Sequence, residues 1–201
     1  MNLIEALNWR YATKQMTGAV VPQAKLDIIL NATLLTPTSS GLQPFEVILI
    51  SNKALREKIL PIAHHQPQIS QASHLMVFAA WDNYSPERVN EHFSYMNKKR
   101  NMPDSTTDDY RNMMLGLFAT QTPEQHFQHA AKQAYIGLGF AMIAAATEEV
   151  DATPMEGFNP AALDVLLNLN DTGFKTTVIL ALGYRNAEKD WLVKLKKCEN
   201  R

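Results

Sequence analysis

The part of the sequence that most limits the possible folds is residues 130–146, where nearly every side chain is apolar. This stretch belongs to a predicted helix that begins at Pro123 and ends at about Glu149, since proline is well tolerated in the first turn of a helix. Gly137 and Gly139 would let another backbone approach this helix closely. A helix without a polar face has to be buried in a core or an interface. In a chain of 201 residues, it therefore predicts a central position in the fold and self-association.

The rest of the chain is predicted to form further helices and a few short strands. Helical patterns cover residues 3–9, 22–35, 53–64 and 160–169, and strand patterns cover residues 45–50, 75–81 and 174–182. Residues 86–118 are mostly helical with a break near Pro103, which suggests an excursion on the surface of the main body. The chain lacks a strict strand–helix alternation, a G-x-G-x-x-G after a strand and a Walker A sequence. We therefore predict one α+β domain over residues 1–201, with a small, mostly antiparallel sheet flanked by helices.

Charge and cysteine content exclude several classes of function. The net charge is −1, so no overall field draws the protein to nucleic acid or to an anionic membrane, and any anionic ligand needs a local cluster of cations. The single cysteine, Cys198, cannot form an intrachain disulfide, which suits a reducing compartment. Residues 1–10 resemble no secretory signal, and the longest apolar run, residues 134–146, is shorter than a membrane span. We expect a soluble, cytoplasmic protein with neither nucleic acid nor membrane as a partner.

Two pairs of histidines could suggest a metal site, and neither pair supports one. His64 and His65 are adjacent and point in different directions on a predicted helix. His126 and His129 could share one helix face, but no third ligand has a suitable spacing. We predict no metal site.

Two segments in the first quarter of the chain could bind a polar ligand. Arg10 and Lys14 lie where the first helix is expected to end, so they could be ordinary helix C-terminal cations or a clamp for an anion such as phosphate. Residues 36–45 (TPTSSGLQPF) could be an ordinary turn. They could also present hydroxyl and backbone N–H groups to a flat polar ligand, with Gln43 as an amide partner.

Two further segments lie in the second half. Residues 154–158 (PMEGF) are placed in the loop after the long helix, where Gly157 would permit close approach to a planar ligand. The basic tail, with Lys194, Lys196, Lys197 and Arg201, could be solvated or could return to a phosphate site.

The order and spacing of these segments resemble the FMN-dependent nitroreductase family over essentially the whole chain. The matching features are R-x-x-x-K near residue 10, P-[ST]-S-x-x-x-Q-P, A-S-H before a strand, P-x-E-G-F near residue 155, a strand that ends in G-Y-R, and the basic tail. The branch most similar is that of oxygen-insensitive NAD(P)H nitroreductases and dihydropteridine reductases. The resemblance implies a nitroreductase-like fold, an intertwined homodimer with two FMN sites at the subunit interface, and a helical excursion, residues 86–120, over the active site.

The resemblance also implies which residues bind the cofactor. Arg10 would hold the phosphate and Lys14 the ring O2 edge and ribityl chain, with Tyr11 and Ala12 between them; Lys197 matches the lysine of a C-terminal K-x-R phosphate motif. The partner subunit would contribute Pro37, Thr38, Ser39 and Gly41. The ring would be lined by Pro154, Met155, Glu156 and Gly157, with a backbone N–H of the Glu156–Gly157 pair near N5. His65 and Gln68 occupy positions where the family often has residues that reach the flavin.

Three positions depart from the family pattern. Ala12 replaces a serine and Gly41 replaces an amide, so two polar contacts are missing. Glu199 stands where the phosphate-binding arginine is expected, and a carboxylate cannot bind phosphate. Lys196, Lys197, Arg185 or Arg201 would have to substitute.

The resemblance implies a ping-pong reaction in which NAD(P)H gives a hydride to FMN and a small acceptor, such as a nitroaromatic or a quinone, then takes the electrons. The cofactor supplies the chemistry, so we assign no catalytic acid or base. The acceptor pocket would lie against the helical excursion, with Phe118 as a candidate. Three alternatives stay open: a flavin or enone reductase on the same scaffold, a flavin-binding protein without turnover, and a helical interaction module without a cofactor.

Overall fold

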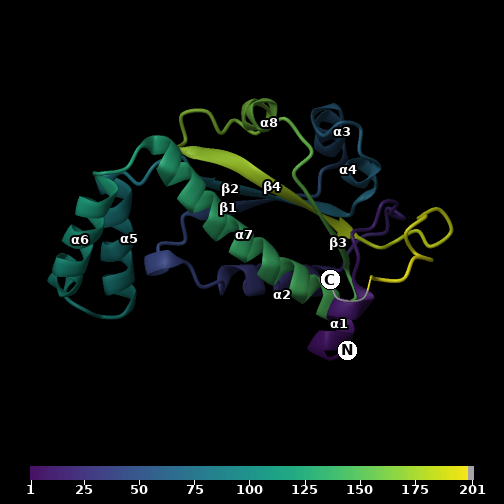
Figure 1. The fold of residues 1–201 in the computed structure, drawn as a ribbon, viewed down its shortest axis with the longest axis horizontal. Coiled ribbons are helices and arrows are strands. Elements are labelled where there is room, and N and C mark those ends of the chain that lie inside the picture. Colours follow the sequence, from purple (N-terminus) through teal and green to yellow (C-terminus); the bar gives the residue numbers. More distant parts are fainter. Residues whose placement is uncertain (199–201) are drawn as a thin grey trace.

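The computed structural model describes residues 1–198, and its centre is a four-stranded sheet with the strand order β1-β2-β4-β3 (Figure 1). The strands are β1 (Phe45–Ile50), β2 (His74–Trp81), β3 (Asp151–Met155) and β4 (Phe174–Gly183). Every pair of neighbouring strands is antiparallel. Together with the surrounding helices, this sheet confirms the predicted α+β class.

Helices cover both faces of the sheet. Along the chain they are α1 (Leu3–Trp9), α2 (Gln23–Leu34), α3 (Lys53–Ile62), α4 (Pro67–Gln71), α5 (Pro86–Lys99), α6 (Asp108–Phe118), α7 (Pro123–Thr147) and α8 (Pro160–Leu166), with short 3-10 turns η1 (Ser39–Gly41) and η2 (Asp104–Thr107). Helices α2 and α7 pack on one face, and α3, α4 and α8 pack on the other (Figure 1). None of these helices is long and apolar enough to cross a membrane.

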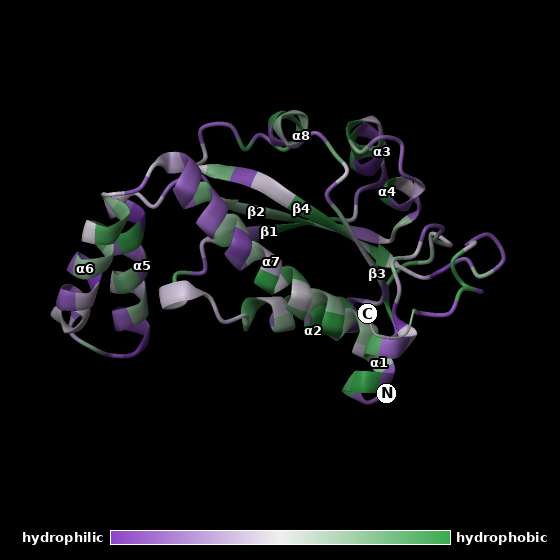
Figure 2. Cartoon of the chain, viewed as in Figure 1, coloured by the Kyte–Doolittle hydropathy of each residue, from purple (hydrophilic) through white to green (hydrophobic). Residues whose placement is uncertain are grey.

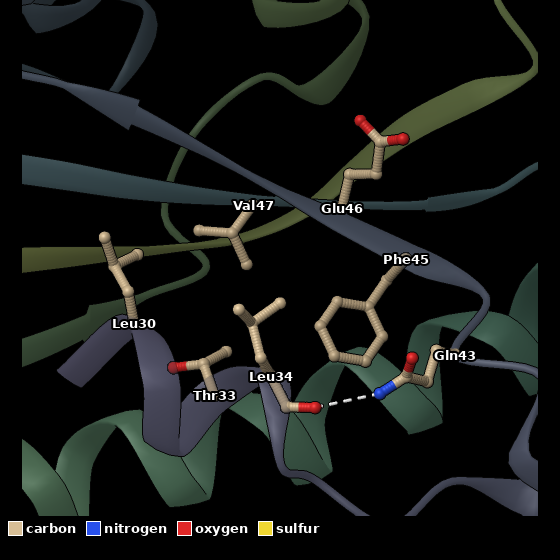
Figure 3. A pocket seen from close by; sticks show the side chains of 7 residues that line it. All are labelled: Leu30, Thr33, Leu34, Gln43, Phe45, Glu46 and Val47. Atoms are coloured by element: carbon tan, nitrogen blue, oxygen red, sulfur yellow. Dashed lines mark hydrogen bonds between the residues drawn. The ribbon is translucent and has the colours of Figure 1, made fainter. Parts of the chain in front are cut away.

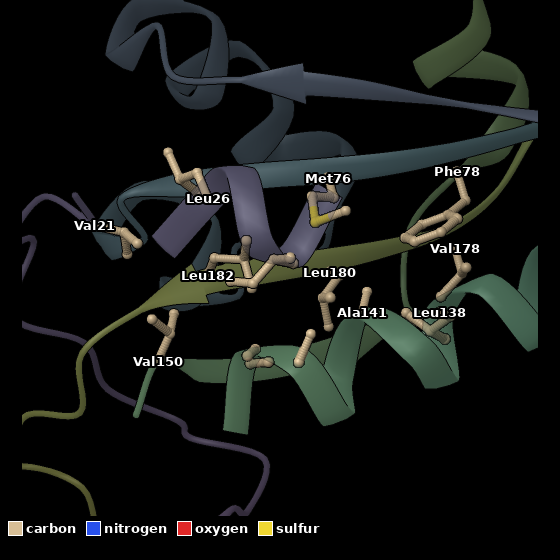
Figure 4. Close-up of a cluster of buried hydrophobic side chains, with 14 of the residues drawn as sticks. Val21, Leu26, Met76, Phe78, Leu138, Ala141, Val150, Val178, Leu180 and Leu182 are labelled. Atoms are coloured by element: carbon tan, nitrogen blue, oxygen red, sulfur yellow. The ribbon is translucent and has the colours of Figure 1, made fainter. Parts of the chain in front are cut away.

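The central strands are apolar on both sides because both sides are covered. In β2, Met76 and Phe78 point into the core beneath α2 and α7, whereas Leu75 and Val77 point toward α3, α4 and α8. Figure 4 shows the first of these clusters, where Leu138 of α7 packs close to the sheet. Continuous apolar sequence is typical of strands that are buried on both faces.

Helix α7 lies along the sheet, as its apolar sequence predicted. Thr122 and Gln125 form a capping box at its first turn. Gly137 leaves room for the Phe45 ring, because a Cβ at this position would lie only 2.7 Å from the end of that ring, which would have to shift. The outward face remains apolar and 37–40% exposed at Tyr135, Ile136, Phe140 and Ile143. Figure 2 shows hydrophobic residues along the C-terminal half of α7, which contains these four residues, and on the neighbouring α1 and α2.

Residues 86–118 protrude from the main body as α5, η2 and α6, at the left of Figure 1. Their own small core contains Tyr84, Val89, Phe93, Met114 and Phe118. The ring of Phe118 stacks on that of Tyr84 at 4.3 Å between centroids and is buried. Phe118 is therefore a core residue of the excursion, and its place at an acceptor pocket stays a prediction.

Several boundaries differ from the prediction. The third helix ends at Ile62, so His64 and His65 lie beyond it with left-handed backbone φ of 53° and 55°. Pro154 and Met155 do not lie in a loop but end strand β3, opposite Leu180 and Ile179. The strand pattern did not reveal β3 because it is a short edge strand that contains a proline, which edge strands tolerate.

Candidate active site

Cations from both ends of the chain surround one cavity of about 490 Å³. Arg10 and Lys14 come from the loop after α1, and Lys196 and Lys197 come from the tail. The other lining residues are Tyr11, Ala12, Leu192, Leu195 and Cys198, so no carboxylate among the described residues lines the cavity. The structure thus brings together the first and last segments that the sequence singled out. Glu199 and Arg201, named as departures or substitutes, lie outside the described residues.

The tail is held against the first helix. The ammonium group of Lys197 donates a hydrogen bond to the backbone carbonyl of Leu7, in the last turn of α1. A cation is favourable there because the C-terminal end of a helix carries partial negative charge. Lys197 therefore has a local structural role and also lines the cavity.

The loop that carries Arg10 and Lys14 is fixed by a buried carboxylate. Asp190 is only 2% exposed, and its Oδ2 accepts hydrogen bonds from the Lys14 backbone N–H at 2.8 Å and the Tyr11 hydroxyl at 3.2 Å. Burial, together with the nearby charge of Asp190, raises the pKa of Tyr11, so this hydroxyl remains a donor at neutral pH. Sequence reasoning missed Asp190.

Arg185, one of the proposed substitutes for the missing arginine, is already neutralised. Its Nη2 lies 2.6 Å from Oδ1 of the buried Asp151. Its guanidinium carbon lies 4.1 Å from the centroid of the Trp9 ring and 4.5 Å from that of Tyr11. Arg185 does not line the cavity, so Lys196 and Lys197 are the tail cations that do.

Gln68 has a buried acceptor that no described residue satisfies. Its side chain is 3% exposed, and its Oε1 has no hydrogen-bond partner. Gln71, one turn later on α4, donates to Oε1 of Gln15 at 2.9 Å and accepts from the backbone N–H of Met16. Because a buried carbonyl oxygen without a donor is costly, Gln68 is suited to accept a hydrogen bond from a ligand. His65, by contrast, is exposed.

A second cavity, of about 370 Å³, is lined by Pro154, Met155 and Glu156 together with residues of α7 and β4. The Tyr135 hydroxyl donates to Oε1 of Glu156 at 2.7 Å, and burial and this carboxylate raise the pKa of Tyr135. The side-chain amide of Gln66 donates to the carbonyl of Gly157 at 2.7 Å. Sequence reasoning missed Tyr135 and Gln66, because nothing in their local sequence points to residues 156 and 157.

A Cβ on residue 157 would lie 2.9 Å from the amide nitrogen of Gln66. Glycine at this position therefore permits the close contact between the two loops. This reason concerns packing within the chain and stands beside the predicted approach of a planar ligand.

The loop that contains Pro37, Thr38, Ser39 and Gly41 is tied to other elements. The backbone N–H of Ser39 donates to Oε1 of Gln133 at 2.9 Å. Gln43, expected as an amide partner for a ligand, instead donates to the carbonyl of Leu34 at 2.9 Å, beside an apolar hollow between α2 and β1 (Figure 3). Pro37, Thr38 and Gly41 line a cavity against α5, and this cavity shares no residue with the one around Arg10 and Lys14.

Within the part of the chain that the structure describes, no group of three or more histidine, cysteine or acidic side chains is arranged to hold a metal ion. His126 contacts Asn83 and the carbonyl of Phe118, and His129 contacts the Tyr84 hydroxyl. Both histidines therefore have structural partners.

Comparison with known proteins decides the family. The sequence profile described as "Nitroreductase family" matches residues 7–184. The chain belongs to the nitroreductase family. This family consists of oxidoreductases, and YfkO of Bacillus subtilis, provisionally named an NAD(P)H nitroreductase, is 30% identical to this chain over 200 residues. The alignment covers 91% of this chain and 88% of YfkO.

Solved nitroreductase-like structures share the fold. One from Exiguobacterium sibiricum, crystallised in complex with FMN, has a TM-score of 0.81 and 15% identity and covers 92% of this chain and 89% of its own. The enone reductase CLA-ER, from gut-bacterial fatty acid metabolism, has a TM-score of 0.80 and 14% identity and covers 100% of this chain and 93% of its own. At these identities, the likeness establishes the nitroreductase-like fold alone.

Proposed function

We propose that this nitroreductase-family chain is an FMN-dependent oxidoreductase. It takes a hydride from NADH or NADPH and passes electrons to a small acceptor, such as a nitroaromatic or a quinone, in a ping-pong cycle. The observation that carries the proposal is the cavity lined by Arg10, Lys14, Lys196 and Lys197, to which no carboxylate of residues 1–198 contributes. A cluster of cations at this place is what an anionic cofactor requires.

The residues present fit FMN. Its phosphate is close to a dianion, and several charged donors are needed to remove it from water. The unsatisfied Oε1 of Gln68 can accept a hydrogen bond from an N–H of the ring. The second cavity, beside Pro154 and Met155, offers an apolar surface that suits an aromatic ring system.

Bound FMN would supply the hydride chemistry, and the protein would supply binding, orientation and charge. Arg10 and the tail lysines hold the phosphate. Lys14 adds a fixed positive charge that stabilises negative charge on the ring, an effect of the same kind as an oxyanion hole. Tyr135 orients the Glu156 carboxylate and so helps to position the backbone of residues 156 and 157.

The proposed unit is a homodimer, with Pro37, Thr38, Ser39 and Gly41 completing the site of the partner and the excursion covering it. Two observations support this. The residues of the 37–41 loop share no cavity with Arg10 and Lys14 of the same chain. Helices α1 and α7 also expose apolar side chains, at Leu3, Ile4, Leu7, Tyr135, Ile136, Phe140 and Ile143. Apolar surface of this kind marks an interface.

Mixing two defective homodimers tests the shared site. One carries Lys14→Ala and the other carries Ser39→Trp, and subunits are exchanged between them. If each site uses Lys14 of one chain and Ser39 of the other, a mixed dimer contains one site without either substitution, and flavin reduction returns. If each site lies within one chain, both sites of the mixed dimer stay defective. Sedimentation should show dimers for both variants.

The reaction is tested by following the visible flavin spectrum under anaerobic conditions. We expect NADH or NADPH to bleach the flavin and an added acceptor to restore its colour. A yellow protein that is not bleached would be a flavin-binding protein without turnover. A protein that stays colourless with added FMN would be an interaction module. The fold shared with an enone reductase makes enone reduction the second candidate, and comparison of kcat/KM for enones, quinones and nitroaromatics separates these activities.

A further inference from the structure

A separate cavity of about 490 Å³ lies between the 36–43 loop and α5, and it shares no residue with the cavity at the tail. Lys99 and Arg100, at the end of α5, line it, as do Tyr95 and His92. No carboxylate among the described residues takes part in its lining. The Tyr95 side chain is 61% exposed.

The two cations are not neutralised within the described chain. Neither Lys99 nor Arg100 forms an ion pair. The Asp104 carboxylate, which follows shortly in the sequence, is bound instead to Arg111 at 3.1 Å. Lys99 Nζ lies 5.5 Å from the centroid of the Tyr95 ring, so one cation is held beside the aromatic surface. This part of the cavity can therefore accept an anionic group.

The walls of the cavity are firmly joined. The Tyr110 hydroxyl of α6 donates to Oγ of Ser40 at 2.8 Å, and His92 of α5 lines the cavity together with Gly41. The loop whose residues 37–41 we assign to the flavin site is thus fixed to the helical excursion. A ligand that starts at this loop can continue along α5.

The order of groups along α5 matches one kind of ligand. From His92 to Lys99 the helix rises about 10 Å at about 1.5 Å per residue, with Tyr95 between them. A ligand that runs outward from the loop therefore meets an aromatic ring first and then two cations. Adenosine with a phosphate on its ribose offers an aromatic base followed by a dianion. Arginine in particular provides a fork of donors that suits phosphate.

We propose that this cavity binds the adenosine 2′-phosphate end of NADPH, with Lys99 and Arg100 at the 2′-phosphate and Tyr95 against the adenine. The inference rests on the proposed function, and it adds a preference for NADPH over NADH. Attraction to the end of the helix alone does not explain the arrangement. The partial negative charge at the end of α5 would attract Lys98 as strongly as Lys99, since both lie in its last turn. Lys98 nevertheless does not line the cavity. Lys98 is therefore the matched control.

Calorimetric titration of the flavin-loaded protein with adenosine 2′,5′-bisphosphate and with 5′-AMP tests the site directly. Because the 2′-phosphate adds at least one charge-assisted hydrogen bond, we expect the bisphosphate to bind at least about tenfold more tightly, a difference of about 1.4 kcal/mol. The double substitution Lys99→Ala and Arg100→Ala should abolish this difference, whereas Lys98→Ala should preserve it. Equal affinity of the unsubstituted protein for the two nucleotides would overturn the proposal.

Steady-state kinetics provide the second measurement. In the double variant, KM for NADPH should rise about tenfold at nearly unchanged kcat, while KM for NADH should stay the same. An equal rise for both donors would place the cations at the shared pyrophosphate and overturn the 2′-phosphate assignment. If neither NADPH nor NADH bleached the flavin, the proposed function would be contradicted instead. The nucleotide titration would still report on Lys99 and Arg100 by themselves.

Discussion

Asp190 Oδ2 accepts a hydrogen bond from the backbone N–H of Lys14 at 2.8 Å, across a sequence separation of 176 residues. The same oxygen accepts from the Tyr11 hydroxyl, and Asp190 Oδ1 accepts from the backbone N–H of Leu192. One buried carboxylate therefore joins the loop after α1 to the start of the tail. This carboxylate fixes the positions of the two cationic segments of the candidate site relative to each other, although it does not line the cavity.

Asp190→Asn should weaken both the fold and flavin binding. The substitution retains the shape but removes the charge from hydrogen bonds that are typically worth about 1.5–3 kcal/mol each, so we expect the free energy of unfolding to fall by an amount in that range. FMN affinity should fall because Lys14 loses its fixed backbone. Urea unfolding and fluorescence titration with FMN measure the two effects. Glu188→Gln, an exposed neighbour, is the control, and equal behaviour of the two variants would contradict the role of Asp190.

Lys14→Ala should affect the ligand and leave the fold unchanged. The Lys14 backbone makes the contact with Asp190, and its side chain lines the cavity. A charge-assisted hydrogen bond is worth about 1.5–3 kcal/mol, so flavin affinity should drop about tenfold or more and reduction by NAD(P)H should slow. The melting temperature without flavin should match that of the unsubstituted protein. Lys53→Ala, on the exposed start of α3, serves as the control; unaltered FMN affinity in Lys14→Ala would show that this side chain is not a ligand.

The sequence predicted those elements whose signals are local. Proline at the first turn and the apolar stretch of residues 130–146 identified α7, and β-branched runs identified β1 and β4. Strand β3 was missed because its five residues, DATPM, become a strand only by pairing with β4. The short helix α4 was missed for a similar reason: it has five residues, and its place is fixed by contacts of Gln71 with Gln15 and Met16.

The residues of the candidate site likewise fall into those with a local sequence signal and those that depend on distant contacts. Arg10, Lys14 and Lys197 were found because clustered charge is visible in the sequence, and they line one cavity in the structure. Asp190 and Tyr135 were not found because each acts through a partner distant in sequence. The ion pair between Arg185 and Asp151 could not be predicted from the sequence either, because it requires β3 and the end of β4 to lie side by side.

His129 should contribute to a loss of stability at acid pH. Burial lowers its pKa, the charges of Lys132 and His126 add to the shift, and its Nδ1 lies 2.8 Å from the Tyr84 hydroxyl. The folded state therefore favours the neutral imidazole ring, whereas a histidine in the unfolded chain titrates at about pH 6.5. Such a group stabilises the fold above the unfolded pKa, and this stability is lost as the pH falls through the folded pKa.

Melting temperatures measured from about pH 7.5 to about pH 5.5, a range that spans the unfolded pKa, test this expectation. His129→Gln keeps a hydrogen-bonding side chain but cannot be protonated, so the melting temperature should fall less steeply with pH than in the unsubstituted protein. His74 and His92, whose pKa values are also lowered by burial, will preserve part of the slope. His64→Asn, at an exposed position with left-handed φ, should leave the slope as it is. An unchanged slope in His129→Gln would assign the acid sensitivity to other groups.

The tail should discriminate FMN from riboflavin. Lys196 and Lys197 line the cavity with Arg10, and riboflavin lacks the phosphate that these cations would bind. Truncation before Lys194, or the double substitution Lys196→Ala and Lys197→Ala, should therefore weaken FMN much more than riboflavin. Titration at low and high salt should show a smaller difference between the two ligands at high salt, because part of the attraction is screened.

Lys194→Ala is the control for this experiment, since Lys194 is exposed and does not line the cavity. Lys197 also donates to the Leu7 carbonyl, so its loss could loosen α1 and weaken any ligand. Riboflavin corrects for this effect, because general loosening lowers the affinity for both flavins equally. A selective loss of FMN affinity thus identifies phosphate binding. An equal loss, or none, would mean that the tail only supports α1, and the phosphate would then have to be held by Arg10 without help from the tail, since Arg185 is bound to Asp151.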